Sequence, residues 1–100
     1  MNVLVTGGSG YFGEVLLSKL LKKGFNCKNF DLNNLDNEYL SSNVETIIGD
    51  IRDRDSLSNA LKGIDIVFHN VAQVPVAKDN NLFFEVNYTG TENLLDLMVR

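Results

Sequence analysis

The sequence contains little cysteine and no long apolar segment. Cys27 is its one cysteine, so no disulfide can form within the chain, and we interpret this residue as a small buried side chain in a strand. No stretch approaches the roughly 20 apolar residues that span a bilayer. Val3, Leu4 and Val5 lead directly into glycines, without the apolar segment of a signal peptide. A cytoplasmic protein is therefore expected.

The sequence also lacks a large excess of either positive or negative charge. Nine Lys and Arg oppose 13 Asp and Glu, and the formal net charge is -4. This mild acidity gives no electrostatic reason for binding nucleic acid or an anionic membrane, so we expect neither as a partner. The 100 residues, 44% of them hydrophobic, suffice for one small domain. We expect a small-molecule ligand and no metal site.

Glycine is concentrated near the start of the chain, at Gly7, Gly8, Gly10 and Gly13. The apolar, β-branched run before these glycines predicts a buried strand, and the pattern after them predicts a helix. Such a turn directs the N–H groups of the helix N-terminus at a ligand, and a pyrophosphate suits that place. Glycines permit the turn, the approach of phosphate to the backbone and close packing of the helix. A plain turn is the alternative, but this strand and helix context favours dinucleotide binding.

Asp31 supports the same interpretation. It ends a predicted second strand at residues 25–30 and lies 18 residues after Gly13. At that position a carboxylate can accept hydrogen bonds from both hydroxyls of the adenosine ribose. The next three residues include no arginine for a 2′-phosphate, so NAD is favoured over NADP. A solvated carboxylate at a strand end is the alternative.

The rest of the chain continues to alternate between strand and helix patterns. This alternation predicts an α/β fold with a parallel sheet. On the first helix, at residues 11–23, we predict an apolar face of Phe12, Val15, Leu16 and Leu20. The remaining predictions are a loop with one helical turn at 32–43, a strand at 44–48, a helix at 52–62, a strand at 64–70, a loop containing Pro75 and a helix from 81 or 82 onward.

Several segments, in order, resemble the extended short-chain dehydrogenase/reductase family, the NAD-dependent epimerases and dehydratases. The segments are TGGSGYFG at 6–13, GDIRD at 49–53, VFHNVA at 67–72 and VNYTGTENLL at 86–95. The resemblance covers essentially the whole chain. It implies a Rossmann-type parallel sheet with helices on both faces and, in this chain, strand order 3-2-1-4.

The resemblance also implies a set of cofactor contacts. Tyr11 and Phe12 would act mainly through backbone N–H groups at the helix N-terminus. The other contacts that it implies are Asp50 and Ile51 at the adenine, Asn70, Val71 and Ala72 beside the cofactor, and Asn87 in support of the active site. Simpler roles stay open for three residues: Asp50 as a helix cap, His69 as a structural strand-end residue, and Asn87 as a solvated helix residue.

The catalytic pair of that family is missing from these residues. The resemblance implies a tyrosine with a lysine four residues later, but the residues four positions after Tyr11, Tyr39 and Tyr88 are valine, asparagine and glutamate. We therefore assign no catalytic residue here. Residues 1–100 are expected to be the N-terminal part of an NAD(P)-binding domain, with the substrate-binding part absent and a homodimer formed by the full-length protein.

Three functions remain open on these residues. The first is the NAD-binding front part of an epimerase or dehydratase-type oxidoreductase that acts by hydride transfer on a nucleotide sugar. The second is a 3β-hydroxysteroid dehydrogenase-like oxidoreductase, and the third is an NAD-binding sensor or scaffold without chemistry. A Tyr-x-x-x-Lys pair after Arg100 would separate the enzymes from the third function.

Overall fold

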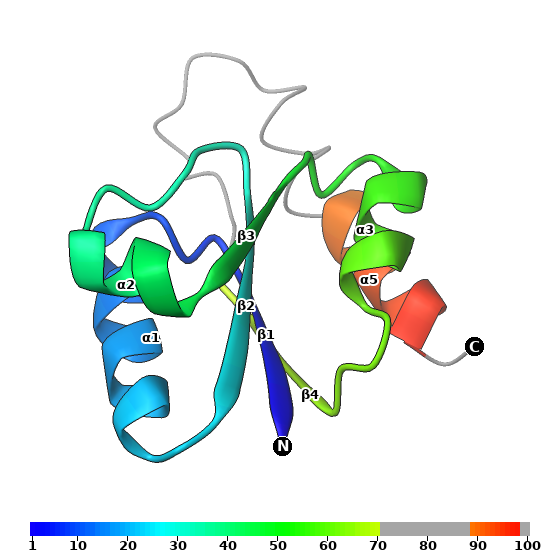
Figure 1. The fold of residues 1–100 in the computed structure, drawn as a ribbon. Coiled ribbons are helices and arrows are strands. Elements are labelled where there is room, and N and C mark those ends of the chain that lie inside the picture. Colours follow the sequence, from blue (N-terminus) through cyan, green and yellow to red (C-terminus); the bar gives the residue numbers. More distant parts are fainter. Residues whose placement is uncertain (71–88, 99–100) are drawn as a thin grey trace.

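A computed structural model describes residues 1–70 and 89–98, and strands alternate with helices over most of this part. The Pro75 loop and residues 81–88 of the last predicted helix lie outside the described residues. The elements are β1 (Asn2–Thr6), α1 (Tyr11–Lys22), β2 (Asn26–Asp31), α2 (Glu38–Asn43), β3 (Glu45–Ile48), α3 (Arg54–Ala60), β4 (Ile66–His69) and α5 (Thr91–Met98) (Figure 1).

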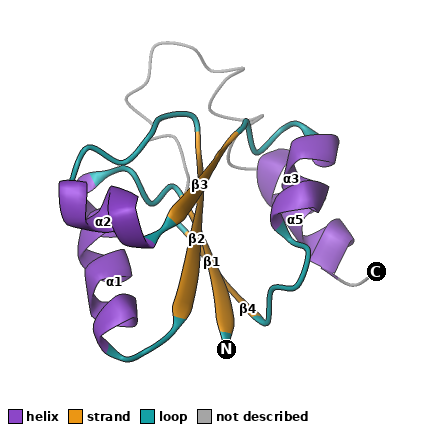
Figure 2. Cartoon of the chain, viewed as in Figure 1, coloured by secondary structure: helices purple, strands orange, loops and turns teal. Residues whose placement is uncertain are grey.

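The four strands form one parallel sheet in the order β3-β2-β1-β4 (Figure 2). Thr6 at the end of β1 lies opposite Phe30 of β2 and His69 of β4. This register brings the carboxyl ends of the strands to one edge of the sheet, where open α/β sheets bind their ligands. The predicted fold class and strand order are confirmed.

Helices cover both faces of the sheet, α1 and α2 on one side and α3 and α5 on the other (Figure 1). Alternate residues of β1 serve the two cores, because successive side chains of a strand point to opposite faces. Val3 and Val5 join the core beneath α1 and α2, whereas Leu4 joins the core beneath α3 and α5. Cys27 is buried in the first of these cores, as predicted, and burial raises the pKa of its thiol.

The predicted apolar face of α1 is partly wrong. Phe12 and Val15 are 65% and 40% exposed, whereas Leu17 is fully buried. The helix packs through Gly13, Leu17 and Leu20, which are spaced by one turn and lie on one face. Because the side-chain-free surface at Gly13 faces the backbone of Gly7 and Gly8, the neighbouring position 12 is directed outward.

α2 and α3 are short helices, each capped by a side chain at its N-terminus. The single turn predicted after β2 is a six-residue helix, α2, in which the Asn37 side chain accepts the Leu40 N–H and Leu40 is buried. The Asp53 side chain caps α3 by accepting the N–H groups of Asp55 and Ser56. Within residues 1–70 and 89–98, no helix has the length and apolar character needed to cross a membrane.

We expect Leu17→Ala to lower the free energy of unfolding by about 2 to 5 kcal/mol, because it opens a cavity in a packed core. Val15→Ala, on the exposed side of the same helix, should change it by less than about 0.5 kcal/mol. Denaturant titration followed by circular dichroism measures both. Equal effects of the two substitutions would contradict the orientation of α1.

Candidate cofactor-binding site

The glycine loop connects β1 to α1 at the carboxyl edge of the sheet. Gly7 has a φ of 72°, a left-handed conformation that favours glycine, and its N–H donates to the Phe30 carbonyl at 2.8 Å. A Cβ added at Gly13 would lie 2.5 Å from the Gly7 carbonyl oxygen and from the Gly8 Cα. The first turn of α1 therefore sits directly on the backbone of the loop, which only glycine at position 13 permits.

Gly10 differs from these glycines, because the described residues leave space beside it. Among residues 1–70 and 89–98, a Cβ there would meet only the Gly7 carbonyl oxygen, at 3.9 Å. Gly10 is also the N-cap residue of α1, and no side chain caps this helix end. A helix N-terminus with open space before it suits an anion such as a diphosphate. A cofactor of the expected kind thus fits the residues present.

The side chains of Tyr11 and Phe12 point away from the protein core. They are 89% and 65% exposed, although both residues begin α1 beside Gly10. This placement agrees with a role that uses their backbone N–H groups rather than their rings.

Asp31 lies at the end of β2 next to the glycine loop. Its Oδ2 accepts the Ser9 N–H at 3.0 Å, and its Oδ1 accepts the Asn33 N–H at 3.0 Å. A carboxylate offers about four acceptor positions, so one remains on each oxygen for further donors. The two hydroxyls of a ribose match this remaining capacity.

Asp50 follows β3 and is engaged by the guanidinium of Arg52. Arg52 Nε donates to Asp50 Oδ1 at 2.9 Å and Nη2 donates to Oδ2 at 2.5 Å, and these hydrogen bonds hold the pKa of Asp50 below its usual value. Asp53, not Asp50, caps the following helix, so the cap alternative for Asp50 is wrong. Ile51 is 4% exposed in the core beneath α3 and α5, which leaves its backbone as the group for an adenine contact.

His69, the last residue of β4, contacts side chains of β1 and α5. Its Nδ1 lies 2.8 Å from the Thr6 hydroxyl oxygen and its Nε2 lies 3.0 Å from the Thr91 hydroxyl oxygen on α5. Asn70 adds a backbone N–H to the Thr6 hydroxyl at 2.9 Å and a side-chain contact with the Gly7 carbonyl at 3.4 Å. Both ring nitrogens are engaged, which agrees with a structural role for His69 at the strand end. Desolvation by neighbouring groups lowers the pKa of His69, although the residue as a whole is exposed.

Three predicted contacts cannot be placed. Val71, Ala72 and Asn87 lie outside the described residues. Among the predicted residues that are described, Asp31 and Asn70 contact the loop directly, whereas Asp50 and Ile51 lie after β3.

Asn29 was missed by the sequence analysis. It is fully buried in β2, and its Oδ1 accepts the Gly8 N–H at 2.8 Å. Its strand also contains Asn26 and Lys28, so residue type alone does not distinguish it. The signal that could have identified it is its place two residues after Cys27, on the face of the strand predicted to be buried, where a polar side chain must find partners.

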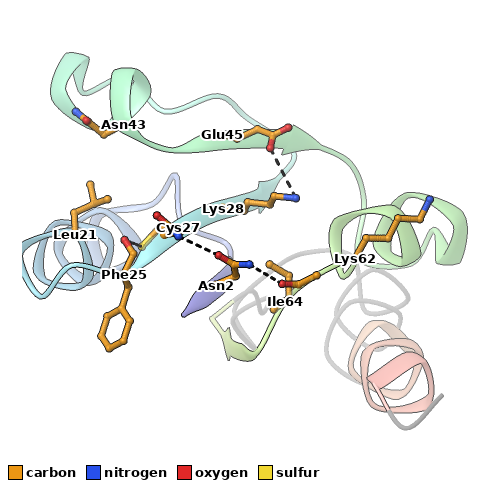
Figure 3. Close-up of a pocket in the computed structure, with 11 residues that line it drawn as sticks. Asn2, Leu21, Phe25, Cys27, Lys28, Asn43, Glu45, Lys62 and Ile64 are labelled. Carbon is orange, nitrogen blue, oxygen red and sulfur yellow. Dashed lines mark hydrogen bonds and ion pairs between the residues drawn. The ribbon is translucent and has the colours of Figure 1, made fainter.

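A recess of about 490 Å³ lies at the opposite edge of the sheet, at the amino ends of the strands (Figure 3). Its polar groups bind one another. The Asn2 side chain donates to the Gly63 carbonyl at 2.9 Å and accepts from Asn26 at 3.2 Å, and Lys28 lies 3.9 Å from Glu45. Because these groups are already paired, the recess offers a ligand less than the glycine loop does.

Sequence comparison finds a matching family model and similar proteins. The model of the 3-beta hydroxysteroid dehydrogenase/isomerase family matches residues 4–100. The uncharacterized protein y4nG of Sinorhizobium fredii is 52% identical over 93 residues, which are 93% of this chain and 23% of that protein. The human sterol-4-alpha-carboxylate 3-dehydrogenase (decarboxylating) is 37% identical over 92 residues, 92% of this chain and 24% of the enzyme. The chain thus spans about a quarter of the length of these relatives.

Structural comparison gives neighbours with bound NAD. The UDP-glucose 4-epimerase of Thermus thermophilus, solved as a complex with NAD, superposes with a TM-score of 0.85 at 34% identity. The match covers 97% of this chain and 33% of the epimerase.

We expect the stability of the protein to fall as the pH decreases below about 6.5, the usual pKa of histidine. The folded state lowers the pKa of His69, so the unfolded state takes up the proton first and protonation favours unfolding. Denaturant titrations at several pH values between about 7.5 and 5.5 measure this, above the range in which exposed carboxylates titrate. His69→Gln, which cannot be protonated, should lose less stability over the same range. An identical pH dependence in the variant would contradict the assignment.

Proposed function

The chain belongs to the 3-beta hydroxysteroid dehydrogenase/isomerase family, and from this premise we propose that it is the NAD-binding front part of an oxidoreductase. The predicted resemblance to the extended short-chain dehydrogenases and epimerases is confirmed by the family match and the epimerase neighbour. NAD would accept a hydride from a carbon that carries a hydroxyl group, and its reduced form would return a hydride to the carbon of a carbonyl group. The proposal for this chain concerns how its own residues hold that cofactor.

One observation carries the proposal, namely the hydrogen bond from the Ser9 N–H to Asp31 Oδ2 at 3.0 Å. It joins the open glycine loop to the carboxylate at the end of β2. The loop suits a diphosphate and the carboxylate suits ribose hydroxyls, and the two groups are adjacent in a dinucleotide. A turn without a ligand would not need the open space beside Gly10, and Asp31 keeps acceptor positions for a ligand after it has bound the Ser9 and Asn33 N–H groups.

The cofactor contacts follow from this arrangement. The N–H groups of Tyr11 and Phe12 would meet the diphosphate across Gly10, and Asp31 would accept the ribose hydroxyls. The remaining assignments are Gly7, Gly8 and Gly13 in the loop, Asp50 and Ile51 at the adenine, Asn70, Val71 and Ala72 beside the cofactor, and Asn87 in support of the active site.

NAD is proposed rather than NADP. A 2′-phosphate would lie beside the Asp31 carboxylate and would be repelled by it. The residues that follow, Leu32, Asn33 and Asn34, supply no positive charge to offset this repulsion. NAD in the epimerase neighbour supports the same choice.

We further propose that residues 1–100 are the N-terminal part of the cofactor domain, since relatives are about four times longer. The family's tyrosine and lysine would then come from another part of the protein. A cytoplasmic homodimer that acts on a small molecule is proposed for the full-length protein. Leu95 and Met98 on α5, 58% and 49% exposed, support a helix-mediated contact of that kind.

Two substrate classes have specific support. The family match and the human relative favour a 3β-hydroxysteroid or a related sterol. The structural neighbour, a UDP-glucose 4-epimerase, favours a nucleotide sugar. Formation of NADH by the full-length protein with each substrate class separates the two, because a 4-epimerase returns the hydride and accumulates no NADH.

We expect Gly10→Val to abolish NAD binding and to leave the fold intact. The part of the chain that the structure describes has room for the new side chain, since its nearest atom to a Cβ is 3.9 Å away. The space that it fills is the one proposed for the diphosphate. Calorimetric titration with NAD measures the loss, and far-ultraviolet circular dichroism monitors the fold. Val15→Ala, one turn later and exposed, is the control. NAD affinity equal to that of the wild type would place the diphosphate elsewhere.

We expect Asp31→Ala to weaken NAD binding by about 1.5 to 3 kcal/mol, the usual contribution of hydrogen bonds to a charged group. The preference for NAD over NADP should decrease at the same time, because the repulsive charge is removed. Dissociation constants of both cofactors measure this. Asp36→Ala removes an exposed carboxylate from the same connection and should change neither constant. A wild-type protein that prefers NADP would overturn the cofactor assignment.

A further inference from the structure

Asn29 is a fully buried polar residue on an inner strand of the sheet, β2. Burial of an amide side chain is unfavourable unless its hydrogen bonds are replaced. Here they are replaced by three: Oδ1 accepts the Gly8 N–H at 2.8 Å, and Nδ2 donates to the Ser9 hydroxyl at 2.9 Å and to the Thr46 hydroxyl at 3.3 Å. Two of the three partners belong to the glycine loop.

The orientation of this amide is determined by its partners. A backbone N–H can only donate, so the oxygen of Asn29 must face Gly8. The two hydrogens of Nδ2 then face the hydroxyl oxygens of Ser9 and Thr46. The side chain therefore has one arrangement in which all its groups are paired.

Ser9 extends these contacts to the ribose carboxylate. Its hydroxyl, which accepts from Asn29, donates to the Asn33 carbonyl at 2.7 Å. Its backbone N–H donates to Asp31 Oδ2 at 3.0 Å. The amide, the loop and the carboxylate thus form one connected set of hydrogen bonds across β2.

We propose that Asn29 is the positioning residue of the phosphate loop. It holds Gly8 and Ser9 against β2, and through Ser9 it sets the spacing between the loop and Asp31. This inference rests on the proposed NAD binding, and it adds a residue that touches neither the diphosphate nor the ribose. Asn29 acts by keeping the loop in the form that accepts a diphosphate.

The consequence is a selective loss of affinity when the amide is removed. Asn29→Val leaves the Gly8 N–H without its acceptor, so the loop occupies its binding form for only a fraction of the time. The apparent affinity for NAD then equals the intrinsic affinity multiplied by that fraction. Adenosine lacks the diphosphate and needs only the base and ribose contacts, including Asp31, which keeps its bond to the Asn33 N–H.

The test measures the dissociation constants of NAD and of adenosine for the full-length protein and three variants. We expect Asn29→Val to weaken NAD binding by about tenfold or more, about 1.4 kcal/mol, and to weaken adenosine binding by much less. Ser9→Ala, at a partly exposed site, should give a smaller loss of NAD affinity, again with little effect on adenosine binding. Thr46→Val removes only the bond to β3 and should bind NAD nearly as the wild type does.

Amide hydrogen exchange in the ligand-free protein supplies a second measurement. The exchange rate of the Gly8 N–H should rise by about tenfold or more in Asn29→Val, because its acceptor is gone, and should stay near the wild-type rate in Thr46→Val. If Asn29→Val does not fold, Ser9→Ala carries the test.

The outcomes are distinguishable. Failure of the wild type to bind NAD would contradict the proposed function, and the exchange rates would still decide the role of Asn29. Unchanged NAD affinity, or equal losses for NAD and adenosine in a folded variant, would overturn the positioning role.

Discussion

The contact of Gly13 with the backbone of Gly7 and Gly8 is the constraint on which the site depends. It places the first turn of α1 on top of the loop, with no side chain between them. The helix N-terminus then opens toward the space beside Gly10 rather than toward the protein interior. The parallel register of β1 and β2 adds the second requirement, because it brings the end of β2 and its carboxylate to the same edge. Each group at this edge is positioned by backbone geometry before any ligand is present.

Support for this edge comes from both neighbours of β1. On one side, Asn29 and Asp31 of β2 hold Gly8 and Ser9. On the other, His69 and Asn70 bind Thr6 and Gly7 from β4. The opposite edge of the sheet is different in kind, since its asparagines and its Lys28–Glu45 pair satisfy one another. The two edges therefore differ in what their polar groups bind. At the carboxyl edge they hold the glycine loop, and at the amino edge they pair with one another.

Much of the fold follows from local patterns in the sequence. The β-branched run before Gly7, the glycine spacing and the acidic residue at the end of β2 predict the first strand, turn, helix and strand, and the structure agrees. The face of α1 was harder, because Phe12 and Val15 are apolar but exposed, and hydrophobicity alone does not show which face meets the sheet. The contacts of Asn29 with the loop and of His69 with Thr91 join residues that are distant in sequence, and no periodic pattern predicts such contacts.

The fit between Gly8 and Asn29 also constrains how this protein can vary. A Cβ at position 8 would overlap the Oδ1 of Asn29, so the space that glycine leaves empty is the space that the amide oxygen uses. A larger residue at position 8 becomes acceptable only with a shorter side chain at position 29, and a shorter side chain leaves the N–H of residue 8 without its acceptor. The two positions should therefore change together among related proteins, or not at all. A loop copied into another member of this family without its partner on β2 would lose the support that shapes it here.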